Sequence, residues 1–326
     1  MGSVYFGGGT PSLLDVHELG KILDTVFREY PVHPDAEITL EANPDDISAA
    51  QLSLWKGMGI NRLSVGLQSF SDTELKWMNR AHDARASEAC LQLIAESAFE
   101  QYSVDLIYGS PWLSDLEWAA HLEKVTAYRV PHLSCYALTM ETGTLFQRQV
   151  QKGIYPAPMQ ERQAAQFLLL MEHMRSKGYR HYEISNFCLP GNIARHNSAY
   201  WQNEPYTGFG PSAHSYDGQK RRWNLSDNNK YIRALSKESL PPSAEEILTS
   251  KQQINEYIML SLRTDGGIAM KRMESMLDMN QREVFLNNIS RWVEAGKISS
   301  GENGYLLTDS GKLFADGIAA DLFLDD

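Results

Sequence analysis

Short apolar runs alternate with segments of helical periodicity along the first 140 residues of this 326-residue chain. The apolar runs predict β-strands at 4–6, 37–43, 62–68, 102–108 and 132–138. Between the first two runs, apolar residues recur at the spacing of one helix face: Val16, Leu19, Leu23, Val26 and Phe27. Strand–helix repeats of this length form parallel βαβ units, in either an open doubly wound sheet or a barrel. The predicted fold class is therefore α/β.

The sequence changes character after residue 142. Residues 143–179 predict a linker and one long helix, whereas 181–224 are rich in Asn, Tyr, Trp, His and Gly, a composition typical of loops and binding sites. A break at Leu240-Pro241-Pro242-Ser243 marks a boundary. We therefore expect three parts: a barrel portion at 1–142, an extension of it at 143–240, and a C-terminal domain at 241–326.

The C-terminal part predicts a winged-helix-like domain. Helices are expected near 245–262, 267–277 and 281–294, followed by a hairpin around 300–304 and a last helix. From Glu245 to the end, eight Lys and Arg stand against fourteen Asp and Glu, and the whole chain carries a net charge of −11. Phosphate binding needs a positive surface, so we expect a packing or protein-contact module and no nucleic acid partner.

Cysteine usage and hydropathy indicate the compartment. Cys90, Cys135 and Cys188 lie far apart, which excludes a disulfide framework and fits the reducing cytoplasm. No run of eighteen apolar residues occurs, so we expect no transmembrane segment.

Three of the predicted strands are polar on one face. Strands buried on both faces are normally apolar throughout. Here Glu41 alternates with apolar neighbours in 37–43, Gln68 does so in 62–68, and Asp105 does so in 102–108. Burying unpaired polar groups costs a few kcal/mol, so this pattern predicts a polar ligand in the mouth of a barrel. The alternative is an ordinary half-exposed sheet with one wet face.

A glycine-rich turn, Gly7-Gly8-Gly9-Thr10-Pro11, directly follows the first predicted strand. Consecutive glycines let the backbone approach a ligand and offer it amide N–H and C=O groups. Alone the turn is weak evidence, but beside the strands that carry Glu41 and Gln68 it predicts a ligand cradle. An unrelated (β/α) enzyme with a phosphate on this turn is disfavoured, because Glu41 and Asp105 would repel the phosphate.

These motifs, in order, resemble the radical S-adenosylmethionine (SAM) coproporphyrinogen-oxidase-like proteins. The matching segments are GGGTPS from Gly7, LEANP at 40–44, RLSVGLQSF at 62–70, Arg80 and SVDLIYG at 103–109. Downstream, the chain is similar to the HemW branch of that family, the heme chaperones, in EISNF at 183–187, RHNSAYW at 195–201 and GFGPSAHSYDG at 208–218. The resemblance implies a (β/α)6 radical SAM barrel of the TIM-like type, incomplete in this chain.

The resemblance implies a SAM site built from Gly8, Gly9, Thr10, Glu41, Gln68, Arg80, Asp105 and Ala137. The Gly-Gly-Thr turn and Glu41 would hold the methionyl amino end, and Arg80 would pair with the carboxylate. Gln68 and Asp105 would bind the ribose hydroxyls, with Ala137 near the adenine.

The family also implies a [4Fe–4S] cluster on a C-x3-C-x2-C loop after the first barrel strand. That loop should precede GGGTP, and the sequence opens at the strand before GGGTP. We therefore expect this chain to lack the first strand and the cluster ligands, through a misassigned start or an incomplete sequence. Neither Cys90, Cys135 nor Cys188 is expected to substitute.

Two histidines are the predicted heme ligands, because heme iron binds His, Cys, Met or Tyr. His196 and His214 lie among aromatic residues that suit a porphyrin face: Tyr200, Trp201, Tyr206, Phe209 and Tyr216. The residues expected to meet the propionates are Arg195, Arg221 and Arg222. Cys135, Tyr136 and Cys188 are weaker candidates. For each histidine the alternative is a hydrogen-bonded structural role.

The resemblance leaves two functions open. One is a heme-binding chaperone that delivers heme to membrane respiratory proteins and carries a SAM site. The other is an oxygen-independent coproporphyrinogen III oxidase, which decarboxylates its substrate oxidatively. The RHNSAYW and AHSY segments favour the chaperone.

Overall fold

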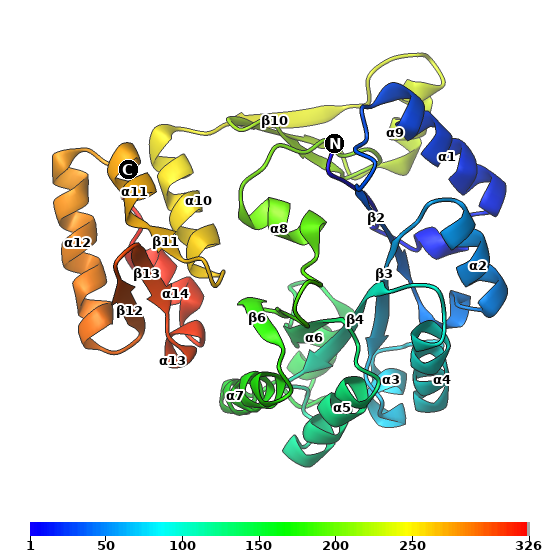
Figure 1. The fold of residues 1–326 in the computed structure, drawn as a ribbon, viewed down its shortest axis with the longest axis horizontal. Helices are drawn as coiled ribbons and strands as arrows, with labels where there is room; N and C mark the ends of the chain where they lie inside the picture. The colour runs from blue at the N-terminus through cyan, green and yellow to red at the C-terminus, as the bar shows by residue number, and fades with distance from the viewer. Residues whose placement is uncertain (325–326) are drawn as a thin grey trace. The chain divides into compact units, whose positions relative to one another are not determined.

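The computed structural model describes residues 1–324, which fall into two compact units. The first unit is Met1–His196 and the second begins at Asn197 (Figure 1). The predicted division at residues 142 and 240 stays a prediction.

A seven-stranded sheet in the order β1-β2-β3-β4-β5-β7-β6 forms the centre of the first unit. Its parallel strands are β1 (Ser3–Phe6), β2 (Glu37–Ala42), β3 (Arg62–Gln68), β4 (Gln101–Tyr108) and β5 (His132–Ala137). They agree with the five predicted strands to within one residue. The sheet then continues with an antiparallel pair, β6 (Arg180–Glu183) and β7 (Asn186–Cys188). These residues were expected to lie in loops, so the sequence missed this pair.

Helices cover one face of this sheet (Figure 1). They are α1 (Val16–Glu29), α2 (Ala49–Gly57), α4 (Ala84–Ala95), α5 (Asp115–Ala127) and α7 (Gln160–Ser176). The shorter elements are η1 (Pro11–Leu13), η2 (Pro44–Asp46), α3 (Asp72–Trp77) and α6 (Leu145–Gln151). Beneath the helices the strands contribute side chains with no exposed surface: Leu40, Leu63, Val65, Leu67, Val104, Leu106 and Leu133. The predicted apolar face of the strands is therefore the face that packs against helices.

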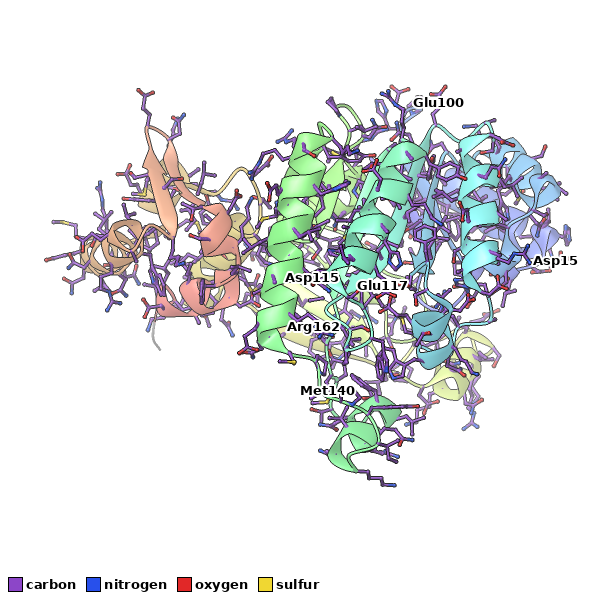
Figure 2. The ribbon with its side chains drawn as sticks, turned by 90° about the horizontal axis from the view of Figure 1, so that it is seen from below. Asp15, Glu100, Asp115, Glu117, Met140 and Arg162 are labelled. Carbon is purple, nitrogen blue, oxygen red and sulfur yellow. The ribbon has the colours of Figure 1, made fainter. Side chains whose placement is uncertain are left out.

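The helices α5 and α7 lie side by side (Figure 2). The buried Gln166 of α7 donates to the backbone of Leu113 at 2.9 Å and to Asp115 at 3.1 Å. Arg162, one turn earlier, donates to the carbonyl of Pro111 at 2.8 Å. These contacts fix the loop between β4 and α5 at the carboxyl end of β4.

The second unit contains two three-stranded antiparallel sheets. The first has the order β10-β9-β8, from β8 (His214–Tyr216), β9 (Lys220–Asn224) and β10 (Ser243–Ile247). The second has the order β11-β13-β12, from β11 (Ile268–Ala269), β12 (Ile298–Gly301) and β13 (Gly304–Leu307). The helices are α8 (Arg195–Trp201), whose first two residues belong to the first unit, α9 (Asn228–Leu235), α10 (Ser250–Leu262), α11 (Met270–Met276), α12 (Met279–Glu294), α13 (Asp309–Lys312) and α14 (Ala315–Asp321).

One predicted helix in this unit begins later than expected. The helix expected near 245–262 starts at Ser250, because Ser243–Ile247 pairs with β9 as a strand. The hairpin around 300–304 is present as β12 and β13. The winged-helix interpretation stays a prediction. None of the helices in the described part of the chain combines the length and apolar composition that a bilayer crossing demands.

Candidate functional site

The glycine turn after β1 is bound to the neighbouring strand through Glu41. The backbone N–H of Gly8 donates to Glu41 Oε2 at 3.1 Å, and the hydroxyl of Tyr5 donates to Glu41 Oε1 at 2.7 Å. Gly8 and Gly9 have φ values of 74° and 119°, which favour glycine. A Cβ on Gly7 would lie 2.6 Å from Tyr5 Cε1 and 2.8 Å from Glu41 Oε1. The turn, Tyr5 and Glu41 therefore form one close-packed group.

A second group lies where β3 ends. Arg80 donates from the same nitrogen to Asn43 Oδ1 at 2.7 Å and to the carbonyl of Gly66 at 2.9 Å. Gln68 Nε2 lies 2.8 Å from the position that a Cβ of Gly66 would take. Gln68 itself has φ 68° and follows an irregularity in the pairing with β4 between Val65 and Gln68. The missing side chain at Gly66 thus makes room for Arg80 and Gln68 together.

Asp105 carries the most perturbed carboxyl group of this region. Its Oδ1 atom is buried and has no hydrogen-bond partner among residues 1–324. Burial raises the pKa of Asp105 to about 7, a hydrogen bond with Ser134 opposes the rise, and the charge of Glu41 adds to it. Burying the charged form of this carboxyl group costs free energy, and one of its oxygens has no partner. Both features indicate a ligand that binds here.

The charges of this region favour a cationic ligand group. Glu41 and Asp105 interact electrostatically with each other, and both raise the pKa of Tyr5, for which burial is the largest cause. Tyr136, at the end of β5, has its pKa raised by burial and by Asp105. Both phenols therefore stay neutral at physiological pH. The charge of this region comes from the two carboxyl groups and is negative.

Most of the predicted SAM residues lie at the carboxyl ends of the parallel strands or just beyond them. Glu41, Gln68 and Ala137 are in the last two positions of their strands, and Asp105 is further from the end of β4. Thr10 caps η1 by position, without a side-chain hydrogen bond. The sequence prediction missed Tyr5 and Ser134. Both lie in predicted strands, and extending the polar-face pattern to the strands of 4–6 and 132–138 would have found them.

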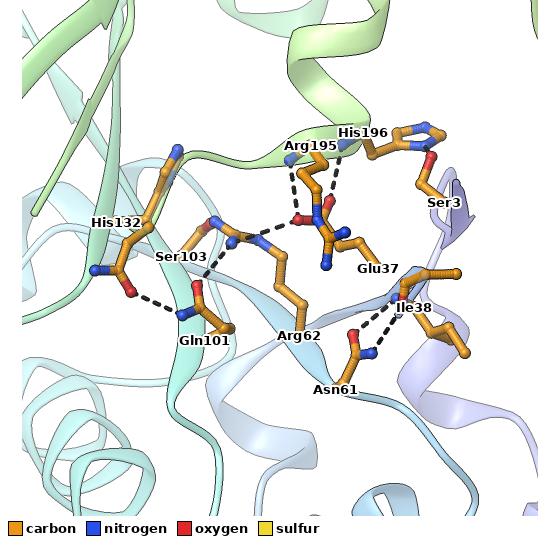
Figure 3. Close-up of polar contacts among 12 residues, drawn as sticks. Ser3, Glu37, Ile38, Asn61, Arg62, Gln101, Ser103, His132, Arg195 and His196 are labelled. Carbon is orange, nitrogen blue, oxygen red and sulfur yellow. Dashed lines mark hydrogen bonds and ion pairs between the residues drawn. The ribbon is translucent and has the colours of Figure 1, made fainter. Parts of the chain in front are cut away.

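A separate polar cluster lies at the opposite, amino ends of the strands (Figure 3). Glu37 and Arg62, the first residues of β2 and β3, form a buried ion pair with 3.7 Å between Oε2 and the guanidinium. Arg62 also donates to Ser103 at 2.9 Å, and His132, which opens β5, is 2.7 Å from the Tyr182 hydroxyl. Sequence reasoning missed this cluster, although a charged residue or histidine opening three strands was a usable signal.

The cluster also fixes the segment that leads into α8. Glu37 accepts hydrogen bonds from the backbone N–H groups of Arg195 at 2.9 Å and His196 at 2.8 Å. The pKa of His132 is held well below its usual value by burial and by Arg62. The cluster therefore contains one full carboxylate–guanidinium pair and a neutral imidazole, which suits a structural role.

Two family models match the chain. Residues 1–125 match the radical SAM superfamily, and residues 248–314 match the HemN C-terminal domain. The heme chaperone HemW of Bacillus subtilis (strain 168) is 33% identical over 317 residues, which cover 97% of this chain and 84% of that protein. The chain belongs to the HemW family of radical SAM proteins.

Further relatives agree with this membership. The HemW of Synechocystis is 36% identical over 299 residues, covering 90% of this chain and 72% of that protein. The mitochondrial radical S-adenosyl methionine domain-containing protein 1 of Mus musculus is 41% identical over 283 residues, covering 82% of this chain and 62% of that protein. The structure of coproporphyrinogen III oxidase (HemN) from Escherichia coli matches with a TM-score of 0.83 at 21% identity, over 99% of this chain and 77% of that chain. This last likeness confirms the radical SAM fold.

The two predicted heme ligands of this HemW-family chain lie in different units. His196 is half-buried, with Nδ1 2.9 Å from the Ser3 hydroxyl and its ring stacked on Tyr5 at 4.7 Å between centroids. Burial lowers the pKa of His196, and Glu37 opposes that shift. His214 is exposed on β8 and stacks on Trp223 at 5.9 Å between centroids. As heme ligands both stay predictions.

The aromatic and arginine residues that were predicted to meet the heme are partly in contact with one another. Tyr206 packs edge-on against Tyr200 and pairs through its backbone with Tyr216, whereas Phe209 is 65% exposed. Arg221 forms an ion pair with Glu256 at 2.5 Å and lies over the Tyr216 ring. Arg222 donates to Ser243 at 3.0 Å, and Arg195 is exposed at the start of α8.

The three cysteines lie in separate elements of the first unit. Cys90 lies in α4, Cys135 in β5 and Cys188 in β7, where a loop was expected; all three are buried, and none of them forms a disulfide. Burial raises the pKa of Cys90 to about 12 and that of Cys135 well above its usual value, so both thiols are protonated at neutral pH. Among residues 1–324 no group of three His, Cys, Asp or Glu side chains is arranged to hold a metal.

Proposed function

We propose that this chain is a heme-binding chaperone of the radical SAM family that delivers heme to respiratory proteins of the membrane. The observation that carries the proposal is the 33% identity to the B. subtilis heme chaperone HemW over 97% of the chain. The reduced, buried cysteines suit a protein of the cytoplasm. The oxidase function is not favoured, because the likeness to HemN at 21% identity concerns the fold alone.

SAM is the proposed ligand of the polar group at the carboxyl ends of the strands. Glu41 and the backbone of Gly8, Gly9 and Thr10 would hold the methionyl ammonium, and Arg80 the carboxylate. The unpartnered Oδ1 of Asp105 and the amide of Gln68 are matched to ribose hydroxyls, with Ala137 beside the adenine. The carboxyl groups of Glu41 and Asp105 in this region would help to offset the positive charges that SAM carries on its sulfonium and ammonium groups.

The [4Fe–4S] cluster of the family does not fit the thiols of this chain, so we derive no cleavage of SAM. In the family, SAM supplies its chemistry together with that cluster. In this chain the proposed residues bind and orient SAM, and Asp105 holds or gives up one proton near neutral pH.

Heme would be bound through His196 or His214, with the propionates on Arg195, Arg221 or Arg222. The exposure of His214 and the nearby aromatic side chains support it as an axial ligand. Cys135, Tyr136 and Cys188 rank lower, since both cysteines are buried.

Hemin titration of the purified protein, followed at the Soret band, tests the proposal. We expect saturable binding that weakens in His196→Ala or His214→Ala and is unchanged in His33→Ala, a control at an exposed histidine. Identical spectra and affinities in all four proteins would overturn the ligand assignment. Consumption of coproporphyrinogen III by the purified chain would instead favour the oxidase.

A further inference from the structure

Tyr5 contacts both the proposed SAM site and a proposed heme ligand. Its hydroxyl donates to Glu41 Oε1 at 2.7 Å, and its ring packs so closely on the glycine turn that a Cβ on Gly7 would lie 2.6 Å from Cε1. The opposite contact is with His196, whose ring stacks on Tyr5 with 4.7 Å between centroids and 18° between planes. Both contacts belong to the first unit.

The His196 side chain has a second contact with β1, and its backbone is restrained separately. Its Nδ1 is 2.9 Å from the hydroxyl of Ser3, which precedes Tyr5 by two residues and so lies on the same face of β1. Its backbone is fixed separately, because Glu37 accepts from its N–H at 2.8 Å. A displacement of Tyr5 would therefore move the ring of His196 without releasing its backbone.

A methionyl ammonium at the glycine turn competes with Tyr5 for Glu41. Glu41 already accepts from Gly8 N–H through Oε2 and from the Tyr5 hydroxyl through Oε1, so an ammonium bound to this carboxylate would share its oxygens with both donors. Sharing the carboxylate with a full positive charge weakens the hydrogen bond that fixes the phenol, in a group too close-packed to absorb the change locally. Once the phenol is less restrained, the ring of His196 that stacks on it is less ordered. Binding of heme to a less ordered ring costs more conformational entropy.

We infer that Tyr5 is a positioning residue that couples the SAM site to His196, so that SAM loosens the ring of His196 and lowers the affinity for heme. The inference rests on the proposed function, because it takes SAM and heme as the two ligands. Coupling between sites is reciprocal, so heme lowers the affinity for SAM by the same factor. SAM would then act as a signal for heme release.

Hemin titration with and without saturating SAM tests this coupling in matched variants. We expect SAM to lower hemin affinity about fivefold in the unchanged protein, at the lower end of coupling between sites. In Tyr5→Phe the ring and its stack remain but the bond to Glu41 is lost, so hemin should bind and the SAM effect should fall to near zero. Tyr128→Phe, at a tyrosine that caps the end of α5 away from both proposed sites, should keep the effect. Hemin affinity that SAM leaves unchanged or raises, or a full SAM effect in Tyr5→Phe, would overturn the inference.

A second readout separates this inference from the heme assignment. In protein with isotope-labelled histidine and no heme, the ring signals of His196 should shift when SAM is added, and they should not shift in Tyr5→Phe. Signals that stay in place in the unchanged protein at saturating SAM would overturn the coupling, whatever residue binds heme. A shift of those signals in a protein whose hemin affinity ignores His196→Ala would support the coupling and remove His196 as the heme ligand.

Discussion

Replacing Asp105 by Asn should change how the stability of the protein depends on pH. Burial raises the pKa of Asp105 from its ordinary value of 3.8 to about 7. A carboxyl group with the higher pKa in the folded state binds its proton more tightly when folded, so protonation favours folding. The contribution is fully present below the unfolded pKa, and it is lost as pH rises to the folded pKa near 7. The unchanged protein should therefore lose stability over this window.

The magnitude follows from the size of the shift. A shift of about three pKa units corresponds to about 4 kcal/mol, because one unit equals about 1.4 kcal/mol. In Asp105→Asn this loss disappears, since the amide has no charge to desolvate and its oxygen still accepts from Ser134. Above pH 7 the variant should exceed the unchanged protein in free energy of unfolding by an amount on the order of 4 kcal/mol.

Urea unfolding at several pH values from about 5 to about 8 measures this difference, followed by tryptophan fluorescence. Asp35→Asn, at an exposed carboxylate, controls for the change in net charge. Parallel stability–pH curves for the unchanged protein and Asp105→Asn would refute the assignment of a buried, costly carboxyl group. A stabilised variant that binds SAM more weakly would show that the cost serves a ligand.

Three further substitutions test the geometry. Gly7→Ala should lower SAM affinity roughly tenfold, because its Cβ would collide with the ring of Tyr5. Gly2→Ala is the control, since its Cβ would meet no atom within 4 Å and should leave the affinity unchanged. Ligand-observed NMR measures both affinities, and equal values would contradict a SAM site at the glycine turn. Glu37→Gln should lower the free energy of unfolding in urea by about 3–5 kcal/mol, because it leaves Arg62 buried without its carboxylate. A loss under about 1 kcal/mol would disprove the structural role of the polar cluster at the amino ends of the strands. Arg80→Lys should weaken SAM binding by about tenfold in the same NMR assay, because lysine lacks the planar guanidinium group that binds a carboxylate through two nitrogens. Its free energy of unfolding should change little. Unchanged SAM binding would remove Arg80 from the site.

The parallel part of the fold could be predicted because its signal is local. Alternating apolar residues and helical periods fix β1 to β5 without knowledge of tertiary contacts. The same alternation placed Glu41 and Asp105 on the polar face. Gln68 was found by the same rule, although its backbone is irregular at that point.

The missed elements depend on contacts that only the folded chain provides. The glutamates of Ser243–Ile247 favour a helix, but the segment forms a strand opposite β9. There Glu245 forms an ion pair with Lys220 at 2.5 Å. The β6–β7 pair has polar residues that satisfy one another when buried, such as Glu183 with Asn186. The polar-face pattern could have placed Tyr5 on the polar face, but its contacts with Glu41 and His196 could not be predicted, because these partners come from distant parts of the sequence.

Transfer of heme to an acceptor protein tests the chaperone function. Protein loaded with hemin is mixed with membrane vesicles that contain a heme-depleted respiratory protein, and the Soret absorbance of each fraction is measured after separation. We expect heme to move to the acceptor faster than from hemin-loaded serum albumin, and not to move to vesicles without the acceptor. Heme that stays on the protein, or that moves equally to both kinds of vesicle, would contradict a chaperone function.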